Sequence, residues 1–187
     1  MVCRYSEDGS PQSSTSNPAD GILILAVTRQ DVARNDPDGY KVIRHVSTSG
    51  FSSTSGPHVK FTSFRVPAFN LIAEPGKGAD VVIRGFTSSA ALVAAVSTGI
   101  MAASFEAALE FAKNDKRGSK TGLLGRQSVV DLLMDIKMRT DAARSMTWKA
   151  CHALESGKGG ELAYEAKIFC SELAVKCVTD AMLVVGV

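Results

Sequence analysis

Residues 79–114 read ADVVIRGFTSSAALVAAVSTGIMAASFEAALEFAKN, and this stretch decides the fold. At a rise of about 1.5 Å per residue it predicts one helix roughly 50 Å long. Before it, apolar residues occur in short runs between turn formers, and from it onward they recur at helical spacing. The sequence therefore predicts an α+β chain, with a partial β-barrel or sheet domain over residues 1–78 and a truncated up-and-down antiparallel helical bundle over residues 79–187.

The first part of the chain has the pattern of short strands. Three runs carry it: residues 21–28 (GILILAVT), 40–46 (YKVIRHV) and 58–66 (HVKFTSFRV), the last with the clearest alternation. Segments rich in Gly, Pro, Asn, Asp and Ser separate them. We expect these runs to be strands of a sheet or barrel.

Two further helices are predicted after the first. Residues 123–155 have one apolar and one charged face, whereas the helix from residue 161 onward is apolar on nearly every side. A helix of the second kind is expected inside a bundle. The connections at residues 115–122 and 156–160 are short and contain glycine, which favours antiparallel neighbours.

The uncharged run at residues 86–105 has a competing interpretation. It is about long enough to span a bilayer. Its residues are mostly Ala, Ser, Thr and Gly, with few of the Leu, Ile and Phe that drive insertion. The composition favours a closely packed buried helix over a membrane span.

Composition and charge exclude some classes of function. Hydrophobic residues make up 45% of the 187 residues and the formal net charge is only +2, without the clustered cations of a nucleic-acid-binding surface. The four cysteines (Cys3, Cys151, Cys170 and Cys177) lack CxxC spacing, which favours free thiols in a reducing compartment. No targeting signal is visible, so we expect a cytoplasmic protein, with a mitochondrial location open if another segment precedes Met1.

Few motifs indicate chemistry by themselves. The three histidines (His45, His58 and His152) have no carboxylate or cysteine at ligand spacing, so no metal site is predicted. The glycine-rich stretches 76–78 and 157–160 lack the spacing of a phosphate-binding loop. Residues 114–120 hold three cations, and Arg117 could bind a phosphate with its planar fork of donors. A solvated basic turn at a helix end explains the same residues, and the spacing alone favours that reading.

Several segments in order resemble the acyl-CoA dehydrogenase superfamily. Residues 61–67 (FTSFRVP), Asn70-Leu71 and residues 76–78 (GKG) resemble its FxxxxVPxxNLL…GxG passage. Gly99, Arg117, Gln127 in GRQSVV and residues 166–169 (AKIF) resemble its C-terminal helical domain. Within the superfamily the fungal nitroalkane oxidases are most similar, on residues 2–12, 54–58, 89–93 and 117–120.

The resemblance implies a flavoprotein. In this superfamily FAD lies between the β-domain and the bundle and reaches onto a neighbouring subunit of a homotetramer. Arg117 and Gln127 stand where an arginine and a glutamine contact the adenine dinucleotide of FAD, and Gly186 stands at the start of another such contact. The family's aromatic residue and glycine after the arginine are here Ser119 and Lys120.

The resemblance also bears on the activity. Ala90 stands where acyl-CoA dehydrogenases usually carry an arginine for coenzyme A, and Ser89 where some carry a catalytic glutamate. A hydroxyl cannot serve as a base unaided. Ser89 fits nitroalkane oxidases, where a serine lines the substrate site, and Phe86 fits either an apolar wall of that site or the core.

The implied reaction is removal of a carbon-bound proton from a nitroalkane by a carboxylate, followed by oxidation to aldehyde, nitrite and hydrogen peroxide. The apolar ending, residues 181–187 (AMLVVGV), has the pattern of an uncapped helix, and we expect further residues to cover it. The resemblance implies that the catalytic Asp or Glu lies beyond Val187 and that a helical domain precedes Met1. This chain alone is therefore predicted to be inactive. An acyl-CoA dehydrogenase and a non-catalytic helical assembly module are the alternatives.

Overall fold

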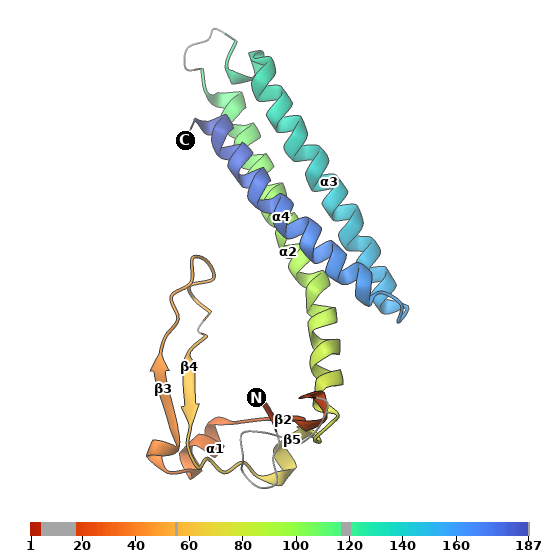
Figure 1. Ribbon diagram of the computed structural model, residues 1–187. Helices are drawn as coiled ribbons and strands as arrows, with labels where there is room; N and C mark the ends of the chain where they lie inside the picture. Colours follow the sequence, from red (N-terminus) through yellow and green to blue (C-terminus); the bar gives the residue numbers. More distant parts are fainter. Residues whose placement is uncertain (5–17, 55, 117–120, 187) are drawn as a thin grey trace. The chain divides into compact units, whose positions relative to one another are not determined.

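The computed structural model (Figure 1) describes residues 1–4, 18–54, 56–116 and 121–186. The chain forms two compact units, Met1–Val82 and Ile83–Val187. The first holds small antiparallel sheets and the second holds long helices, which confirms the predicted fold class. The longest helix, α2 (Gly78–Asn114), begins at residue 78, and the two units divide between Val82 and Ile83, within its first turns.

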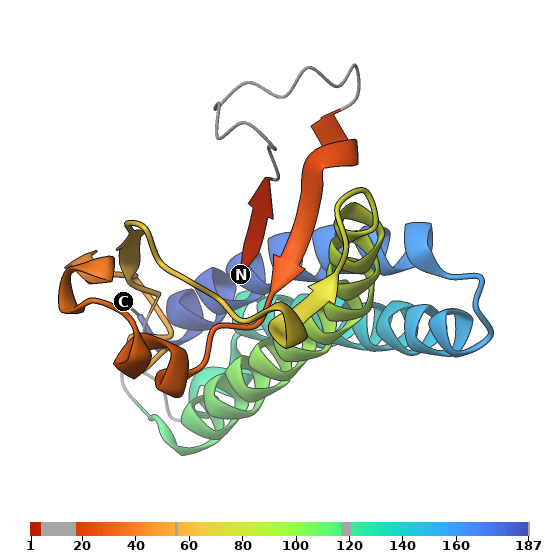
Figure 2. The same cartoon turned by 90° about the horizontal axis from the view of Figure 1, so that it is seen from below.

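The first unit contains two sheets. Strand β2 (Ile22–Leu25) lies between β1 (Val2–Arg4) and β5 (Leu71–Ala73), antiparallel to both, as Figure 2 shows. Strands β3 (Tyr40–Arg44) and β4 (His58–Phe61) pair antiparallel as a second sheet. The Tyr40 and Phe61 rings of this sheet lie at a tilted angle with centroids 5.4 Å apart, and Phe64 meets Phe61 edge to face at 5.1 Å.

The predicted strand at residues 58–66 is too long. It ends at Phe61, because Ser63 adopts a left-handed backbone conformation with φ of 47°. Beyond that turn the backbone of Arg65 pairs with the Asn35 side chain: the Arg65 N–H donates to Oδ1 (2.6 Å), and Nδ2 donates to the Arg65 carbonyl (2.8 Å). A side-chain amide thus replaces the strand partner that the alternating pattern led us to expect.

A short helix, α1 (Arg29–Arg34), was not predicted, and a capping box holds it. The Thr28 hydroxyl accepts from the Asp31 N–H (3.2 Å), while the Asp31 carboxylate accepts from the Thr28 N–H (2.8 Å). Asp31 is only 3% exposed and also accepts a bond from Asn70 Nδ2 at 2.8 Å. The asparagine of the VPxxN passage therefore ties the turn before β5 to α1.

The glycine at the start of α2 has a steric reason. A Cβ on Gly78 would lie 2.6 Å from the carbonyl oxygen of Ile22, so only glycine lets the helix begin against strand β2. This close approach accounts for the second glycine of the GKG passage.

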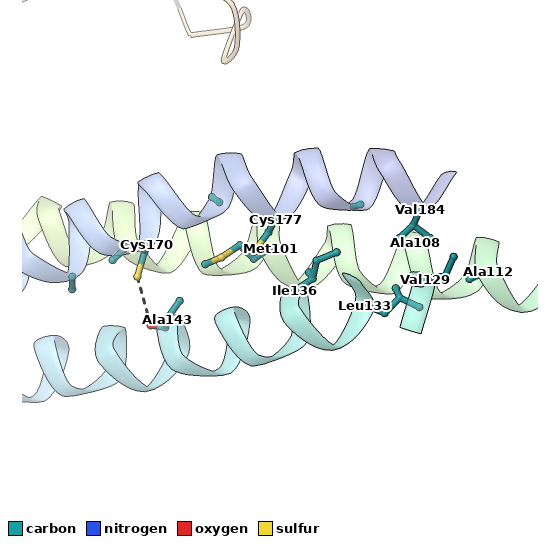
Figure 3. Close-up of a cluster of buried hydrophobic side chains, with 14 of the residues drawn as sticks. Met101, Ala108, Ala112, Val129, Leu133, Ile136, Ala143, Cys170, Cys177 and Val184 are labelled. Carbon is teal, nitrogen blue, oxygen red and sulfur yellow. Dashed lines mark hydrogen bonds between the residues drawn. The ribbon is translucent and has the colours of Figure 1, made fainter. Parts of the chain in front are cut away.

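The second unit is a bundle of α2, from Ile83 onward, with α3 (Gln127–Glu155) and α4 (Gly160–Val185). Helix α3 begins at Gln127, four residues after the predicted start at residue 123, because residues Leu123–Gly125 form a 3-10 turn. Figure 3 shows the core, whose largest fully buried side chains are Met101, Ile136, Cys170 and Cys177. Small residues are buried between α3 and α4, the two helices that pack most closely: Ala143, Ala150, Ala166, Ala174 and Ala181.

Polar groups inside the bundle are paired with one another. Thr98 and Thr147 hydroxyls lie 3.3 Å apart, and the Cys170 thiol, 3.5 Å from the Thr147 hydroxyl, donates to the Ala143 carbonyl (Figure 3). An ion pair between Arg139 and Asp180 links α3 to α4.

Among the residues that the structure describes, α2 is the one helix long and apolar enough to cross a membrane. Its stripe of Ala94, Met101, Ala108 and Ala112 is buried in the core of the bundle. Only 28% of the most apolar window of α2 is buried, so the expectation of a helix buried throughout is not met.

Met101→Ala is expected to destabilise the protein by about 2–5 kcal/mol, because it removes a fully buried side chain and leaves a cavity between three helices. Urea unfolding measures the effect. Met134→Ala, at a residue that is 51% exposed on α3, is the matched control and should stay within about 0.5 kcal/mol. Equal effects would contradict the placement of Met101 in the core.

Asp31→Asn tests the capping box. The Thr28 hydroxyl and N–H bonds lower the pKa of Asp31, so its charged form stabilises the folded state above the ordinary carboxyl pKa of about 3.9. That stability is lost as pH falls through the lower folded-state pKa. The variant should melt earlier than the unchanged protein at about pH 7, and the difference should shrink by about pH 3.

The control for this experiment is Asp38→Asn. Asp38 also has a lowered pKa, through its bond to Lys41, but its side chain is 82% exposed and the pair should contribute little. A difference in melting that did not depend on pH would argue against a charged Asp31 in the folded state.

Candidate functional site

A cavity opens at the end of the bundle where the connection between α2 and α3 meets the last turn of α4. Its apolar wall includes Leu123, Val129 and Val184, each at most 9% exposed. Asp115, Arg126 and Ser128 add polar groups to the lining. The cavity therefore offers an apolar surface with charged and hydrogen-bonding groups, which suits a ligand of mixed character.

Local backbone bonds build this end of the bundle. The Asp115 N–H donates to the Phe111 carbonyl (2.9 Å) and its own carbonyl accepts from Leu123 (3.2 Å), which closes the connection into a loop. Arg126 then caps α3 without a side-chain bond to the first turn. A helix start with no carboxylate or hydroxyl cap presents positive backbone dipole, which favours an anionic group nearby.

Two of the three predicted cofactor residues, Gly186 and Gln127, fall at or beside this cavity. Gly186 lines it, and Gln127 is the first residue of α3, between the lining residues Arg126 and Ser128. Gln127 is exposed, and its Nε2 donates to the Asp131 carboxylate at 2.7 Å. The structure thus brings Gly186 close to the start of α3. Arg117 lies outside the described residues.

The expectation of an uncapped last helix is wrong. Gly186 takes the left-handed conformation with φ of 90°, and its N–H donates to the Met182 carbonyl at 2.9 Å. Glycine adopts this conformation without strain, so α4 ends in a regular C-cap.

The predicted substrate-pocket residues lie elsewhere on the bundle, near the beginning of its part of α2. Phe86 is 64% exposed, so it does not belong to the core of the bundle. Ser89 is half-buried, and its Oγ donates to the Phe86 carbonyl at 3.0 Å. A ring and a hydroxyl one turn apart offer an apolar and a polar contact side by side.

Sequence reasoning missed how far this face extends. Val93, Val96 and Ile100 continue from Phe86 and Ser89 at spacings of three and four, and they are 40–50% exposed. Helix α4 lies in the bundle, as its apolar composition predicted, but Ile168, Val175 and Met182 on it are 64, 69 and 48% exposed. The sequence signal for this exposed face was that α2 and α4 carry apolar residues on more than one side. A bundle of three helices can cover only some of those sides.

Four described carboxylates have clearly lowered pKa values, each held down by a hydrogen bond: Asp31 from Thr28, Asp38 from Lys41, Glu74 from Lys77 and Asp141 from Lys137. A base that removes a proton from carbon is typically tuned the other way, by burial that raises its pKa. None of these four has that character.

The buried Cys177 thiol is not activated. Burial raises the pKa of Cys177 despite the nearby Arg139 guanidinium, so its sulfur stays protonated near neutral pH. In the described ranges no three His, Cys, Asp or Glu side chains gather as a metal site.

Comparison with known proteins places these features in a family. The family model for the acyl-CoA dehydrogenase C-terminal domain matches residues 76–187. A nitroalkane oxidase from Podospora anserina is 46% identical over all of this chain, and its solved structure superposes with a TM-score of 0.92. One from Fusarium oxysporum is 43% identical, again over the full chain. The short-chain acyl-CoA dehydrogenase of Megasphaera elsdenii is 30% identical over 97% of it.

The match covers only part of each relative. The chain spans 44% of both nitroalkane oxidases and 50% of the dehydrogenase. The chain is therefore at most about half as long as these relatives.

Thiol labelling tests the burial of the cysteines. With Ellman's reagent the exposed Cys151 should react first and the half-buried Cys3 more slowly, while Cys170 and Cys177 should react only on unfolding. Cys151→Ser should remove the fast phase, and Cys177→Ser should leave it intact. Fast labelling that persisted without Cys3 and Cys151 would show that the core thiols are reachable.

Proposed function

The chain belongs to the acyl-CoA dehydrogenase family, and on that premise we propose that it is part of an FAD-dependent enzyme similar to nitroalkane oxidases. The observation that carries this proposal is identity of 43–46% with two nitroalkane oxidases along the whole chain, against 30% with an acyl-CoA dehydrogenase. In the proposed reaction a nitroalkane, oxygen and water give an aldehyde, nitrite and hydrogen peroxide.

The cavity at the end of the bundle fits an edge of FAD. Gln127 offers an exposed amide, Arg126 a cation and the start of α3 its positive dipole, which together suit a dinucleotide with a pyrophosphate. An added Cβ on Gly186 would meet nothing within 4 Å, so the backbone there is open to a ligand. We assign Gln127 and Gly186, with Arg117, to the adenine dinucleotide of an FAD held mainly by a neighbouring subunit of a homo-oligomer. When bound, FAD would take up the electrons of the oxidised substrate.

The surroundings of Ala90 support a nitroalkane over a coenzyme A thioester. Ala90 is 2% exposed and belongs to a small cluster with Ala91, Ala163 and Leu154, so this position offers no cation for a phosphate-bearing substrate. Ser89 can bond a small polar head group such as a nitro group, and Phe86 can contact an alkyl chain. These two residues would orient the substrate while a carboxylate supplied by another segment accepts the proton.

Anaerobic mixing distinguishes the two substrate classes in the full enzyme that contains this chain. Nitroethane should bleach the flavin absorbance, and butyryl-CoA should not. Bleaching by the thioester alone would favour an acyl-CoA dehydrogenase.

The chain by itself should not consume oxygen with nitroethane, because we assign the proton-accepting carboxylate to another segment. An oxygen electrode and added FAD are sufficient for the measurement. Turnover by the isolated chain would show that the base lies within these residues and would overturn that assignment.

A further inference from the structure

Thr87 on α2 is held by a side chain of α4. The Tyr164 hydroxyl lies 2.9 Å from Thr87 Oγ1, and the Thr87 hydroxyl donates to the Ile83 carbonyl at 2.8 Å. Because that bond uses the only proton of the threonine hydroxyl, Tyr164 must be the donor in the contact between the two side chains. The result is a chain of two bonds from α4 to the backbone of α2.

The backbone of α4 also approaches Thr87 closely. A Cβ on Gly160, the first residue of α4, would lie 3.4 Å from Thr87 Cγ2. Ala90, Ala91 and Ala163 are buried beside this contact in a small cluster of their own. This part of α2 is therefore fixed to the beginning of α4 by contacts separate from the main core.

The contact at Thr87 has a directional effect that the alanines lack. Alanine methyl groups set how near two helices come, but they resist rotation and sliding only weakly, whereas a hydrogen bond fixes one direction. Successive residues of a helix are turned by about 100°. Fixing the direction of Thr87 therefore fixes the directions of its neighbours Phe86 and Ser89.

We propose that Tyr164 is a positioning residue for the substrate pocket: its hydroxyl, through Thr87, sets the rotation of the α2 segment that carries Phe86 and Ser89. This inference rests on the proposed function, because it assumes that Phe86 and Ser89 contact the substrate. Tyr164 is 39% exposed, so loss of its hydroxyl should change the pocket more than the stability of the bundle.

The test uses Tyr164→Phe and Thr87→Val in the full enzyme, both of which keep the size of the side chain and remove the bond. Each should lower kcat/KM for nitroalkanes by about tenfold, since small displacements of a substrate-orienting group have effects of that order or larger. KM should rise more for long than for short nitroalkanes, because Phe86 contacts the alkyl chain. The double variant should be no worse than either single one.

Two variants serve as controls. Thr87→Ser keeps the hydroxyl and should retain the kinetics of the unchanged enzyme. Tyr40→Phe removes a tyrosine hydroxyl from strand β3 in the first unit and should have no effect. Unchanged kinetics in Tyr164→Phe, or additive losses in the double variant, would overturn the proposal.

A second measurement separates this inference from the proposed function. Hydrogen exchange in the chain itself should be about tenfold faster at the amides around Phe86 and Ser89 in Tyr164→Phe, with no change around Ile136. Suppose that the unchanged enzyme did not oxidise nitroalkanes but exchange in Tyr164→Phe rose as expected. The contact between Tyr164 and Thr87 would then be supported, and the assignment of the substrate would be wrong. An active enzyme with unchanged exchange and kinetics in the variant would overturn the inference alone.

Discussion

Close packing of alanines between α3 and α4 is the constraint on which the bundle depends. Ala143, Ala150, Ala166 and Ala181 are all at most 8% exposed, and their small volume lets the two helices approach closely. The few large side chains of the core, such as Met101 and Ile136, then fill the space that remains beside α2. A larger residue in the alanine seam would separate the helices and disturb both ends of the bundle together.

Alanines set the distance between the helices, but polar pairs set their alignment. Arg139 is 20% exposed and bonds Asp180 of α4, which is 14% exposed, as well as Asp135 of its own helix. Burial works to lower the pKa of Arg139, but the bond and charge of Asp180 and the charge of Asp135 raise it above its ordinary value. The guanidinium therefore stays charged, and sliding α4 along α3 would leave a half-buried charge without its partner.

The sequence was most informative where structure is local. Helical periodicity, with glycines at residues 78 and 160, predicted the three long helices to within a few residues. Strands β1 and β5 are three residues each and exist only because β2, far away in sequence, pairs with both, so no local pattern identifies them. Similarly, α1 depends on a capping box and on Asn70. Phe86 and Ser89 came from resemblance alone, and only the structure shows the exposed face to which they belong.

Helix α4 connects the two places to which function is assigned. Its first turns carry Gly160 and Tyr164 against Thr87, and Gly186 follows its last residue at the cavity beside α3. With 26 residues it is about 39 Å long, so the two places do not touch. They are linked by one stiff helix, whose distance from α3 is set by the alanine seam and whose position along α3 is set by the Arg139–Asp180 pair. A change at that seam would therefore move the proposed substrate and cofactor contacts together, whereas loss of the Tyr164 hydroxyl would act on one end only.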